Sequence, residues 1–356
     1  MGETEKETIG VILLNLGGPD SLQAVRPFLY NLFSDRKIIR LGSPFLQRPI
    51  AWLISSLRSK KTEKIYSLIG GRSPILDITS KQAEALEEAL NKESGVRSQE
   101  SPPPIPPPQG GRVREGVKFK VYVGMRYWHP FIDEAVPEIY RDGVRKLIAI
   151  SMYPHYSYAT AGSSLPRLKK VLSGYPIEVF CISSWFNHPL YIDALVDVIK
   201  KGLESFAINS ELRTQNSELK MPVLFSAHNL PESLIKEGDP YVNQIQGTIG
   251  EIIKRLNIEW YLSYQSKSGP VKWLEPSTKD MLKRFAESGY KNILLVPISF
   301  VSDHVETLYE IDILYKNIAK RLGMVLKRVD SLNIHPLFIE ALKNMVMQGA
   351  REKCWA

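Results

Sequence analysis

Residues 223–231 read Val-Leu-Phe-Ser-Ala-His-Asn-Leu-Pro, a short apolar run that leads into a histidine, His228. Residues 292–298, Asn-Ile-Leu-Leu-Val-Pro-Ile, form a second run of this kind. Glu306 follows it in the segment 299–310, Ser-Phe-Val-Ser-Asp-His-Val-Glu-Thr-Leu-Tyr-Glu. Near-continuous apolar runs of this length are typical of parallel strands that are buried on both faces. Because loops at the carboxyl ends of such strands bind ligands, His228 and Glu306 are the first candidates for a functional site.

Apolar runs alternate with amphipathic stretches along the chain. Four further runs with the character of buried strands occupy residues 10–16, 119–124, 146–152 and 177–182. The amphipathic stretches between the runs cover residues 79–89, 133–140, 191–203, 241–256 and 278–288. This alternation predicts right-handed crossovers and a doubly wound parallel sheet. A chain of 356 residues, 44% of them hydrophobic, is long enough for two such domains or one large one.

The composition limits the cellular setting and the partners. A net charge of +8 indicates an anionic partner, and it leaves nucleic acid, an anionic lipid surface and a carboxylated small molecule open. No apolar run approaches the roughly 18–20 residues that span a bilayer, and the acidic start, residues 1–7, is neither a secretion signal nor an Arg-rich transit peptide. Two cysteines, Cys181 and Cys354, are too few for a disulfide framework. We therefore expect a cytoplasmic protein.

The segment at residues 92–116 interrupts the alternation. Its centre, residues 101–111, reads Ser-Pro-Pro-Pro-Ile-Pro-Pro-Pro-Gln-Gly-Gly. Such a tract cannot pack into a core and is typical of exposed, extended chain. It can dock on a partner domain, but an insertion between a helix and a strand is the simpler interpretation.

Three other segments at predicted strand ends carry polar or aromatic residues. Residues 14–19, Leu-Asn-Leu-Gly-Gly-Pro, predict either a tight turn or a backbone that approaches a ligand closely, and they match no phosphate-binding loop. In residues 124–130, Arg126 can clasp a carboxylate, and Tyr127 can cover a flat ligand or pack in the core. Residues 153–164 are rich in hydroxyl groups that cap a helix or bind an anion.

Both leading candidates have a structural alternative. His228 can be a satisfied histidine at a strand end. Glu306 stands three residues after Asp303, which is capping-box spacing, so it can cap its own helix. Glu310 lies one turn further on the same predicted helical face. A line of carboxylates on one face is costly unless it is solvated or serves a cation, so the pattern favours a metal route. No H-E-x-x-H, C-x-x-C or G-x-S-x-G motif offers another catalytic chemistry.

Taken in order, these segments resemble the ferrochelatase family, whose members insert ferrous iron into a porphyrin to make haem. The segments that carry the resemblance are residues 14–19, 70–74, 124–130, 153–164, 225–231, 238–241, 265–270, 273–274 and 297–312. The ordered set is far more specific than any one segment. Leu314 departs from the family pattern, because many members carry another acidic residue there. The tail, with Cys354 alone, lacks the cysteine cluster with which some members bind an iron–sulfur centre.

The resemblance implies a fold of two Rossmann-like doubly wound lobes. Each lobe is expected to contain a parallel four-stranded sheet, with a porphyrin cleft between the lobes. The expected first lobe covers residues 8–160 and is completed by the C-terminal helix, residues 330–356. The expected second lobe covers residues 161–329. In the family, the residues that match His228 and Glu306 face each other across the cleft.

The resemblance also implies roles for individual residues. His228 and Glu306 are the expected iron ligands, and both are expected to be catalytic together with Glu310. Asp303 and His304 are expected to support them. The residues expected to contact the porphyrin are Leu16, Arg126, Tyr127, Tyr156, Trp185, Gln265 and Phe300.

The chemistry of metal insertion explains these residue types. Two pyrrole protons must leave as iron enters a free-base porphyrin, and a neutral imidazole is a suitable base near neutral pH. Iron(II) accepts imidazole and carboxylate ligands, and few ligands are expected because a strong multidentate site would hold the iron too tightly. Rigid apolar walls can hold the macrocycle in a bent shape. Fe²⁺ is a substrate in this chemistry, and neither an organic cofactor nor an iron–sulfur cluster is expected.

Residues 36–64 combine eight basic side chains with apolar residues such as Phe45 and Trp52, the composition of an interfacial amphipathic segment. The corresponding region forms a lip of the porphyrin cleft in the family. We expect a lip or a peripheral contact with the inner face of a membrane, with a solvated basic helix as the alternative.

The expected partners are protoporphyrin IX and ferrous iron, with membrane contact through Arg36–Lys64 and no nucleic acid. A chelatase for coproporphyrin III or for cobalt remains an alternative, as does a porphyrin carrier without catalysis. The presence of His228, Glu306 and Glu310 argues against the carrier.

Overall fold

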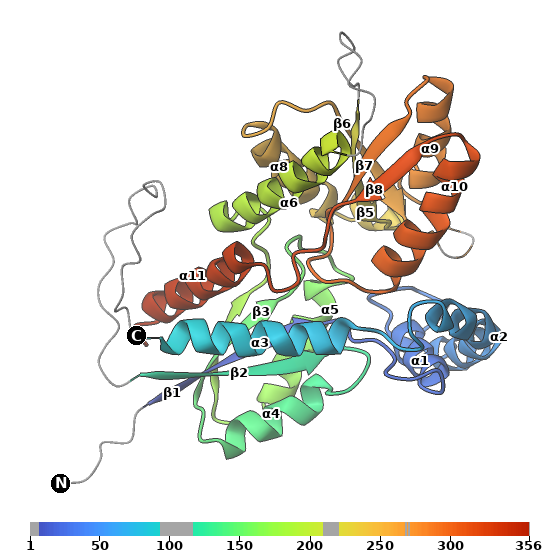
Figure 1. Cartoon of the computed structure of the whole chain (residues 1–356). Helices are drawn as coiled ribbons and strands as arrows, with labels where there is room; N and C mark the ends of the chain where they lie inside the picture. The colour runs from blue at the N-terminus through green and yellow to red at the C-terminus, as the bar shows by residue number, and fades with distance from the viewer. Residues whose placement is uncertain (1–6, 93–116, 209–220, 268, 270, 356) are drawn as a thin grey trace, which may run out of the picture.

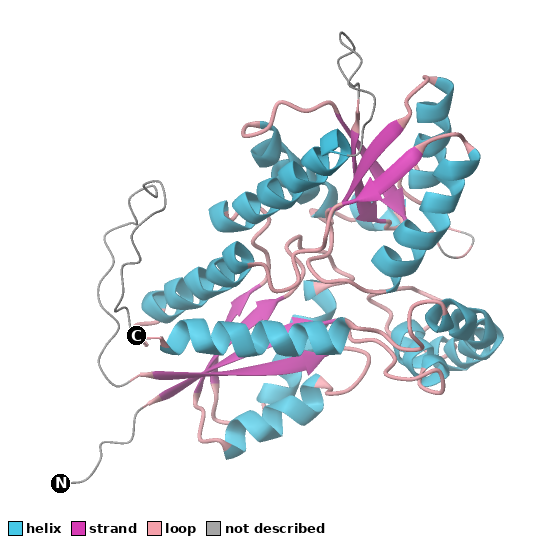
Figure 2. Cartoon of the chain, in the orientation of Figure 1, coloured by secondary structure: helices cyan, strands magenta, loops and turns pink. Residues whose placement is uncertain are grey.

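The structure is a computed structural model that describes residues 7–92, 117–208 and 221–355, apart from residues 268 and 270. The strands form two four-stranded sheets, as predicted, with the orders β2-β1-β3-β4 and β6-β5-β7-β8. Every pairing within the two sheets is parallel. Figure 2 shows helices on both sides of each sheet. The predicted insertion, apart from Lys92, lies outside the described residues.

The first sheet is built around β1 (Thr8–Asn15), which is buried from Ile9 onward. Its other strands are β2 (Lys118–Met125), β3 (Lys146–Ser151) and β4 (Glu178–Ile182). The helices of this part of the chain are α1 (Val25–Ser34), α2 (Gln47–Ser67), α3 (Ile75–Asn91), α4 (Ile132–Arg141) and α5 (Ala161–Leu172). The predicted lobe boundary at residue 160 is wrong. Because β4 pairs with β3 and α5 is the crossover between them, the first lobe extends to Ile182.

The second sheet is built around β5 (Val223–His228). Its other strands are β6 (Trp260–Gln265), β7 (Asn292–Pro297) and β8 (Val325–Arg328). The remaining helices before the C-terminal one are α6 (Pro189–Ile208), α7 (Glu232–Lys236), α8 (Tyr241–Ile253), α9 (Thr278–Glu287), the π-helix η1 (Glu306–Tyr315) and α10 (Lys316–Arg321). Neither β6 nor β8 is among the strands predicted from apolar runs. The first mixes polar and half-exposed residues, and the second is only four residues long.

The C-terminal helix α11 (Pro336–Glu352) returns to the first lobe, as predicted. It packs on α3 and against β3 and β4, and it also contacts α6 (Figure 1). The largest apolar core is continuous through both lobes, since it contains Leu13 of β1, Phe225 of β5 and Phe338 of α11. Within the described part of the chain, no helix is long and apolar enough to cross a membrane.

The segment that follows β7 lies against the first lobe. The ring of Phe300 in this segment is 6.2 Å from the ring of Tyr153, which follows β3. Gln82 of α3 donates hydrogen bonds to Ser302 Oγ at 3.0 Å and to Asn333 O at 2.7 Å. These contacts hold the loops at the strand ends of the second sheet close to those of the first.

Candidate active site

The structure brings His228 and Glu306 into direct contact. His228 is the last residue of β5, and Glu306 is the first residue of η1, which follows β7. Because β5 and β7 pair in parallel, their carboxyl ends lie at the same edge of the sheet. His228 Nδ1 lies 2.9 Å from Glu306 Oε1. An ionised carboxylate only accepts hydrogen bonds, so Nδ1 carries the proton in this contact.

Glu306 does not cap its own helix. The helix η1 begins without a side-chain cap. The Glu306 carboxylate instead accepts hydrogen bonds from Ser266 Oγ at 2.7 Å and from Gln265 Nε2 at 3.3 Å, at the end of β6. Its side chain is 14% exposed. The capping alternative is wrong, because the carboxylate is directed across the ends of the neighbouring strands.

Ser266, which is not among the predicted site residues, belongs to the site. Its Oγ lies 2.7 Å from Glu306 Oε2 and 2.6 Å from Glu310 Oε2. A hydroxyl carries one proton, so it donates to one of these oxygens at a time, and the other carboxyl group must donate to it. The Ser266 backbone has a φ of 69°, a conformation that is uncommon outside glycine. Residues held in such conformations are frequent at functional sites.

Glu310 is the carboxyl group better suited to hold this proton. Burial, and then the charge of Glu306, raise the pKa of Glu310 to about 7. Burial also acts to raise the pKa of Glu306, but the charge of His228 and its hydrogen bond outweigh burial and lower that pKa. Two carboxyl groups with opposite shifts are typical of acid–base sites. Both belong to η1, and π-helical segments are themselves frequent at functional sites.

The imidazole of His228 responds to the same carboxylates. Enclosure by the protein acts to lower the pKa of His228, but the charge of Glu306, its hydrogen bond and the charge of Glu310 together raise it. The backbone of His228 is held from both sides, since its N–H donates to Ser299 Oγ at 2.8 Å and its carbonyl accepts from Tyr241 Oη at 3.0 Å. The side chain remains 36% exposed. The imidazole is therefore fixed in place but still accessible.

His304 lies beside the pair, whereas Asp303 has no described hydrogen bond with His228 or Glu306. His304 Nδ1 lies 3.1 Å from Ser302 O, and a carbonyl only accepts, so Nδ1 is protonated and Nε2 keeps its lone pair. Nε2 lies 3.9 Å from Glu306 Oε1 and has no hydrogen-bond partner among the described residues. Burial lowers the pKa of His304. Asp303 accepts hydrogen bonds from Thr307, Ser331 and Asn333.

Phe300 forms the apolar surface beside the pair. Its ring centroid lies 5.8 Å from that of His228 and 4.0 Å from that of His304. Phe300, Leu16 and Tyr156 all keep part of their surface exposed, so they remain candidates for porphyrin contact. Gln265 is almost fully buried, and its amide serves the site through the hydrogen bond to Glu306.

Three expected porphyrin contacts are engaged elsewhere in the structure. Arg126 and Tyr127 each donate to Asp35 Oδ2 at 2.7 Å, so the carboxylate that Arg126 clasps belongs to the protein itself. Tyr127 is only 1% exposed and Trp185 only 4%. The Trp185 ring stacks on Phe338. The prediction for Tyr127 and Trp185 is therefore corrected, because buried rings have no surface to offer a ligand, and the guanidinium of Arg126 is committed to Asp35.

The two glycines of residues 14–19 lie in irregular chain directly after β1. Gly17 has a φ of +83°, which disfavours other residues. A Cβ on Gly18 would lie within 2.4 Å of Ser73 Oγ, so the chain passes too close to the neighbouring loop for a side chain. These constraints explain why glycine is required at both positions, and the choice between a tight turn and a close backbone approach to a ligand stays a prediction.

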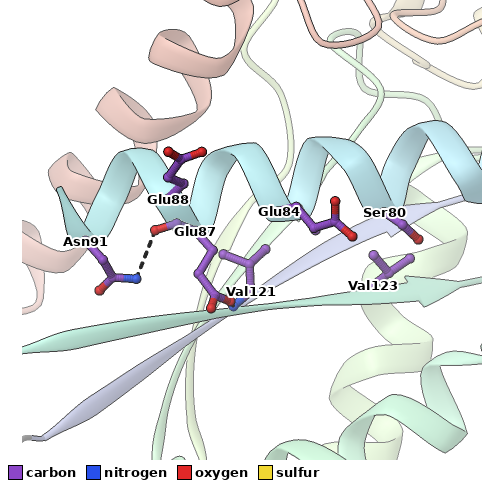
Figure 3. A pocket seen from close by; sticks show the side chains of 8 residues that line it. Ser80, Glu84, Glu87, Glu88, Asn91, Val121 and Val123 are labelled. Carbon is purple, nitrogen blue, oxygen red and sulfur yellow. Dashed lines mark hydrogen bonds between the residues drawn. The ribbon is translucent and has the colours of Figure 1, made fainter.

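A separate pocket of about 560 Å³ lies between α3 and β2 (Figure 3). The residues that line it are Ser80, Ala83, Glu84, Glu87, Glu88, Asn91, Val121 and Val123. None of them is a predicted site residue. The Glu87 carboxylate already accepts the N–H of Val121 at 2.8 Å, which ties α3 to the edge strand.

Solved structures support the class of fold. SirB from Bacillus subtilis with Fe³⁺ matches the chain with a TM-score of 0.50 at 11% sequence identity, over 96% of each chain. At this identity the likeness concerns the fold alone. Two parallel α/β lobes of this kind form a chelatase fold.

The family follows from the sequence comparisons. The ferrochelatase family model matches residues 8–350. Proteins named ferrochelatase from Geotalea uraniireducens and Desulfotalea psychrophila are 47% and 48% identical over 344 and 343 residues, which cover 96% of this chain and 97% of each relative. A ferrochelatase from Synechocystis is 43% identical over 352 residues, or 97% of this chain and 83% of that relative. The chain belongs to the ferrochelatase family, which is a family of metal-chelating lyases.

Proposed function

We propose that the chain inserts ferrous iron into protoporphyrin IX, forming protohaem with the release of two protons, and that His228 and Glu306 carry the reaction. The observation that supports this assignment most directly is the 2.9 Å contact between His228 Nδ1 and Glu306 Oε1 at the ends of two neighbouring strands. Imidazole nitrogen and carboxylate oxygen are both suitable ligands for Fe²⁺.

His228 is the base in the proposed mechanism. Its Nδ1 is engaged by Glu306, which leaves Nε2 as the ring nitrogen for a pyrrole proton or for iron. Glu306 stabilises the imidazolium that forms when the proton is taken up. Ser266 and Glu310 extend the hydrogen-bonded chain away from His228. Phe300 supplies an apolar surface against which the macrocycle can be held while the iron enters.

Iron is a substrate in this proposal, and no resident cofactor or nucleic acid is required. Only two iron ligands, His228 and Glu306, are predicted. So few ligands suit a metal that must be released into the porphyrin. Glu310 and His304 stand close enough to influence them electrostatically.

Steady-state haem formation by the purified protein tests the proposal. Protoporphyrin IX with Fe²⁺ should give protohaem under anaerobic conditions, followed by its absorption spectrum. Coproporphyrin III and Co²⁺ are the matched comparisons. A higher kcat/KM with either of them would replace the proposed substrate by the alternative. Tight porphyrin binding without product would identify a carrier and refute the enzymatic assignment.

We also propose that the region Arg36–Lys64 contacts a membrane surface, with the protein otherwise in the cytoplasm. Apolar side chains that are exposed here include Phe45 at 78%, Trp52 at 57% and Leu57 at 73%. Lys60 and Lys61 of α2 are exposed on the same segment. Figure 1 shows α2 at one end of the molecule, away from α11. Apolar and basic groups exposed together are typical of interfacial helices.

Sedimentation with vesicles tests the membrane proposal. Binding to anionic vesicles should exceed binding to neutral ones and weaken with salt, because each basic group near the surface contributes about 1 kcal/mol and the attraction is screened over about 10 Å at 0.1 M salt. Trp52→Ala and the double variant Lys60→Glu/Lys61→Glu should each bind more weakly. The control Lys169→Glu/Lys170→Glu changes two exposed lysines of α5 and should bind as the parent does. Equal binding to neutral and anionic vesicles would contradict the electrostatic part.

A further inference from the structure

Arg328, the last residue of β8, connects two carboxylates on either side of the active-site glutamates. Its Nη1 forms an ion pair with Asp303 Oδ1 at 3.0 Å, and it donates hydrogen bonds to Val329 O at 3.2 Å and to Ser331 Oγ at 3.4 Å. Its Nε and Nη2 donate to Asp312 Oδ2 at 3.1 and 2.8 Å. The Arg328 side chain is 9% exposed, and the two carboxylates are 19% and 22% exposed. The three residues form a largely buried ion-pair group, hydrogen-bonded on the Asp312 side, unlike the solvated pairs on the surface.

The two carboxylates lie on either side of Glu306 and Glu310 along the chain. Asp303 precedes Glu306 by three residues, and Asp312 follows Glu310 by two. One guanidinium group therefore connects the segment just before η1 with the middle of η1. Because the i→i+5 hydrogen bonds of a π-helix are seldom sustained beyond a single turn, a ten-residue π-helical segment needs support from its surroundings.

The guanidinium is itself held on a rigid element. Arg328 pairs with Leu295 in the register between β8 and β7, and β7 leads directly into the segment that carries Phe300 and Asp303. The sheet that positions His228 at the end of β5 therefore also holds Asp312 of η1, through Arg328 at the end of β8. Arg328 does not touch His228, Glu306 or Glu310 in any described contact, so its support for them is transmitted through the position of the helix.

We propose that Arg328 is a positioning residue for metal insertion: by holding Asp303 and Asp312 together, it keeps Glu306 and Glu310 converged on Ser266 and keeps Glu306 against His228. The inference rests on the proposed function. Lysine cannot reproduce this role, because a single ammonium group lacks the planar fork that reaches two carboxylates at once.

The test compares Arg328→Lys with Lys316→Met. Lys316 binds the same Asp312 at 2.7 Å, but its side chain is 43% exposed and does not reach Asp303. The expected result for Arg328→Lys is a fall in kcat of about tenfold or more per folded molecule, since small misplacements of catalytic groups have effects of this size. The Michaelis constant for protoporphyrin should stay within about twofold. Lys316→Met should change neither constant by more than about twofold. Asp312→Asn removes the charge of one of the two carboxylates that Arg328 contacts, with little change in side-chain volume, and it should also lower kcat.

The outcomes separate positioning from stability and from the proposed function. A kcat within twofold of the parent in Arg328→Lys or Asp312→Asn, an equal loss in Lys316→Met, or a change confined to the Michaelis constant would overturn the inference. Amide hydrogen exchange supplies a readout that does not depend on activity. Faster exchange confined to residues 303–315 in Arg328→Lys, and absent in Lys316→Met, supports the clamp, and unchanged exchange there refutes it. A parent protein that forms no haem would fail the proposed function, while the exchange data would still decide the role of Arg328.

Discussion

Replacing Glu310 by glutamine should stabilise the protein at alkaline pH. The Glu310 carboxyl group lies beside Glu306 and shares Ser266 Oγ with it. Burial and the charge of Glu306 raise its pKa from 4.5 to about 7. The folded protein therefore binds this proton more tightly than the unfolded chain does. Its contribution to stability is fully present below the unfolded pKa and is lost as pH rises through the folded pKa.

The size of the effect follows from the shift. A difference of 2.5 between about 7 and 4.5 corresponds, at about 1.36 kcal/mol per pKa unit, to roughly 3 kcal/mol of destabilisation when the group is ionised in both states. Glutamine carries no charge, so Glu310→Gln removes this cost. The gain in the free energy of unfolding should be about 3 kcal/mol near pH 8. Near pH 5.5 it should be only about 1 kcal/mol, because the folded carboxyl group keeps its proton there and the pH is only about one unit above the unfolded pKa of 4.5.

Urea unfolding of the parent and Glu310→Gln across this pH range measures the effect. Glu88→Gln is the matched control, since Glu88 is a fully exposed carboxylate paired with Lys92 and its pKa is lowered rather than raised. The control should show a small change of the opposite sign. A Glu310→Gln variant that is less stable than the parent near pH 8, or a gain that does not grow with pH, would refute the reasoning about the paired carboxyl groups.

The other predictions concern His228, Ser266 and the Pro-rich insertion. His228→Ala should reduce haem formation by at least about 100-fold while porphyrin still binds. Haem formation is followed by absorbance in buffer without imidazole. Near-normal turnover in a folded variant would contradict the assignment of His228 as the base. Ser266→Ala should lower kcat while leaving the Michaelis constant for porphyrin within about twofold, and a change in the Michaelis constant alone would contradict its place in the site. Deleting residues 99–111 should leave turnover and the melting temperature nearly unchanged, since the tract lacks core-forming residues; lost activity in the soluble deletion protein would show that the tract contacts the site.

The architecture could be predicted largely because hydrophobic periodicity is local. The runs at β1, β3, β5 and β7 are buried on both faces, so their sequences are continuously apolar and unmistakable. The edge strands of the second sheet carry a weaker signal. Trp260 in β6 is 39% exposed and Val325 in β8 is 53% exposed, so the pattern there does not differ from a loop. The boundary between the lobes depends on which sheet β4 joins, and pairing between strands cannot be read from one sequence.

The candidate site could be predicted in part for the same reason. His228 ends β5, and Glu306 follows β7 after a loop, so strand direction brings the two segments to the same edge of the sheet, and the family resemblance implied that the two residues face each other. Ser266 stands at the end of β6, a strand without a clear pattern, and its positive φ has no signature in a serine. Tyr127 and Trp185 are aromatic residues at strand ends, where core packing and ligand contact have the same sequence pattern. Their burial is decided by Asp35 and by α11, which are distant in the sequence.

The turnover of Glu306→Gln tests the central claim most directly. The amide nearly preserves the volume of the side chain, but it neither stabilises an imidazolium at His228 nor binds Fe²⁺ well. The rate of protohaem formation per folded molecule, measured with protoporphyrin IX and Fe²⁺ at saturation, should fall by about 100-fold or more, with the dissociation constant for porphyrin little changed. A rate within a few fold of the parent would contradict the claim that the His228–Glu306 pair carries metal insertion.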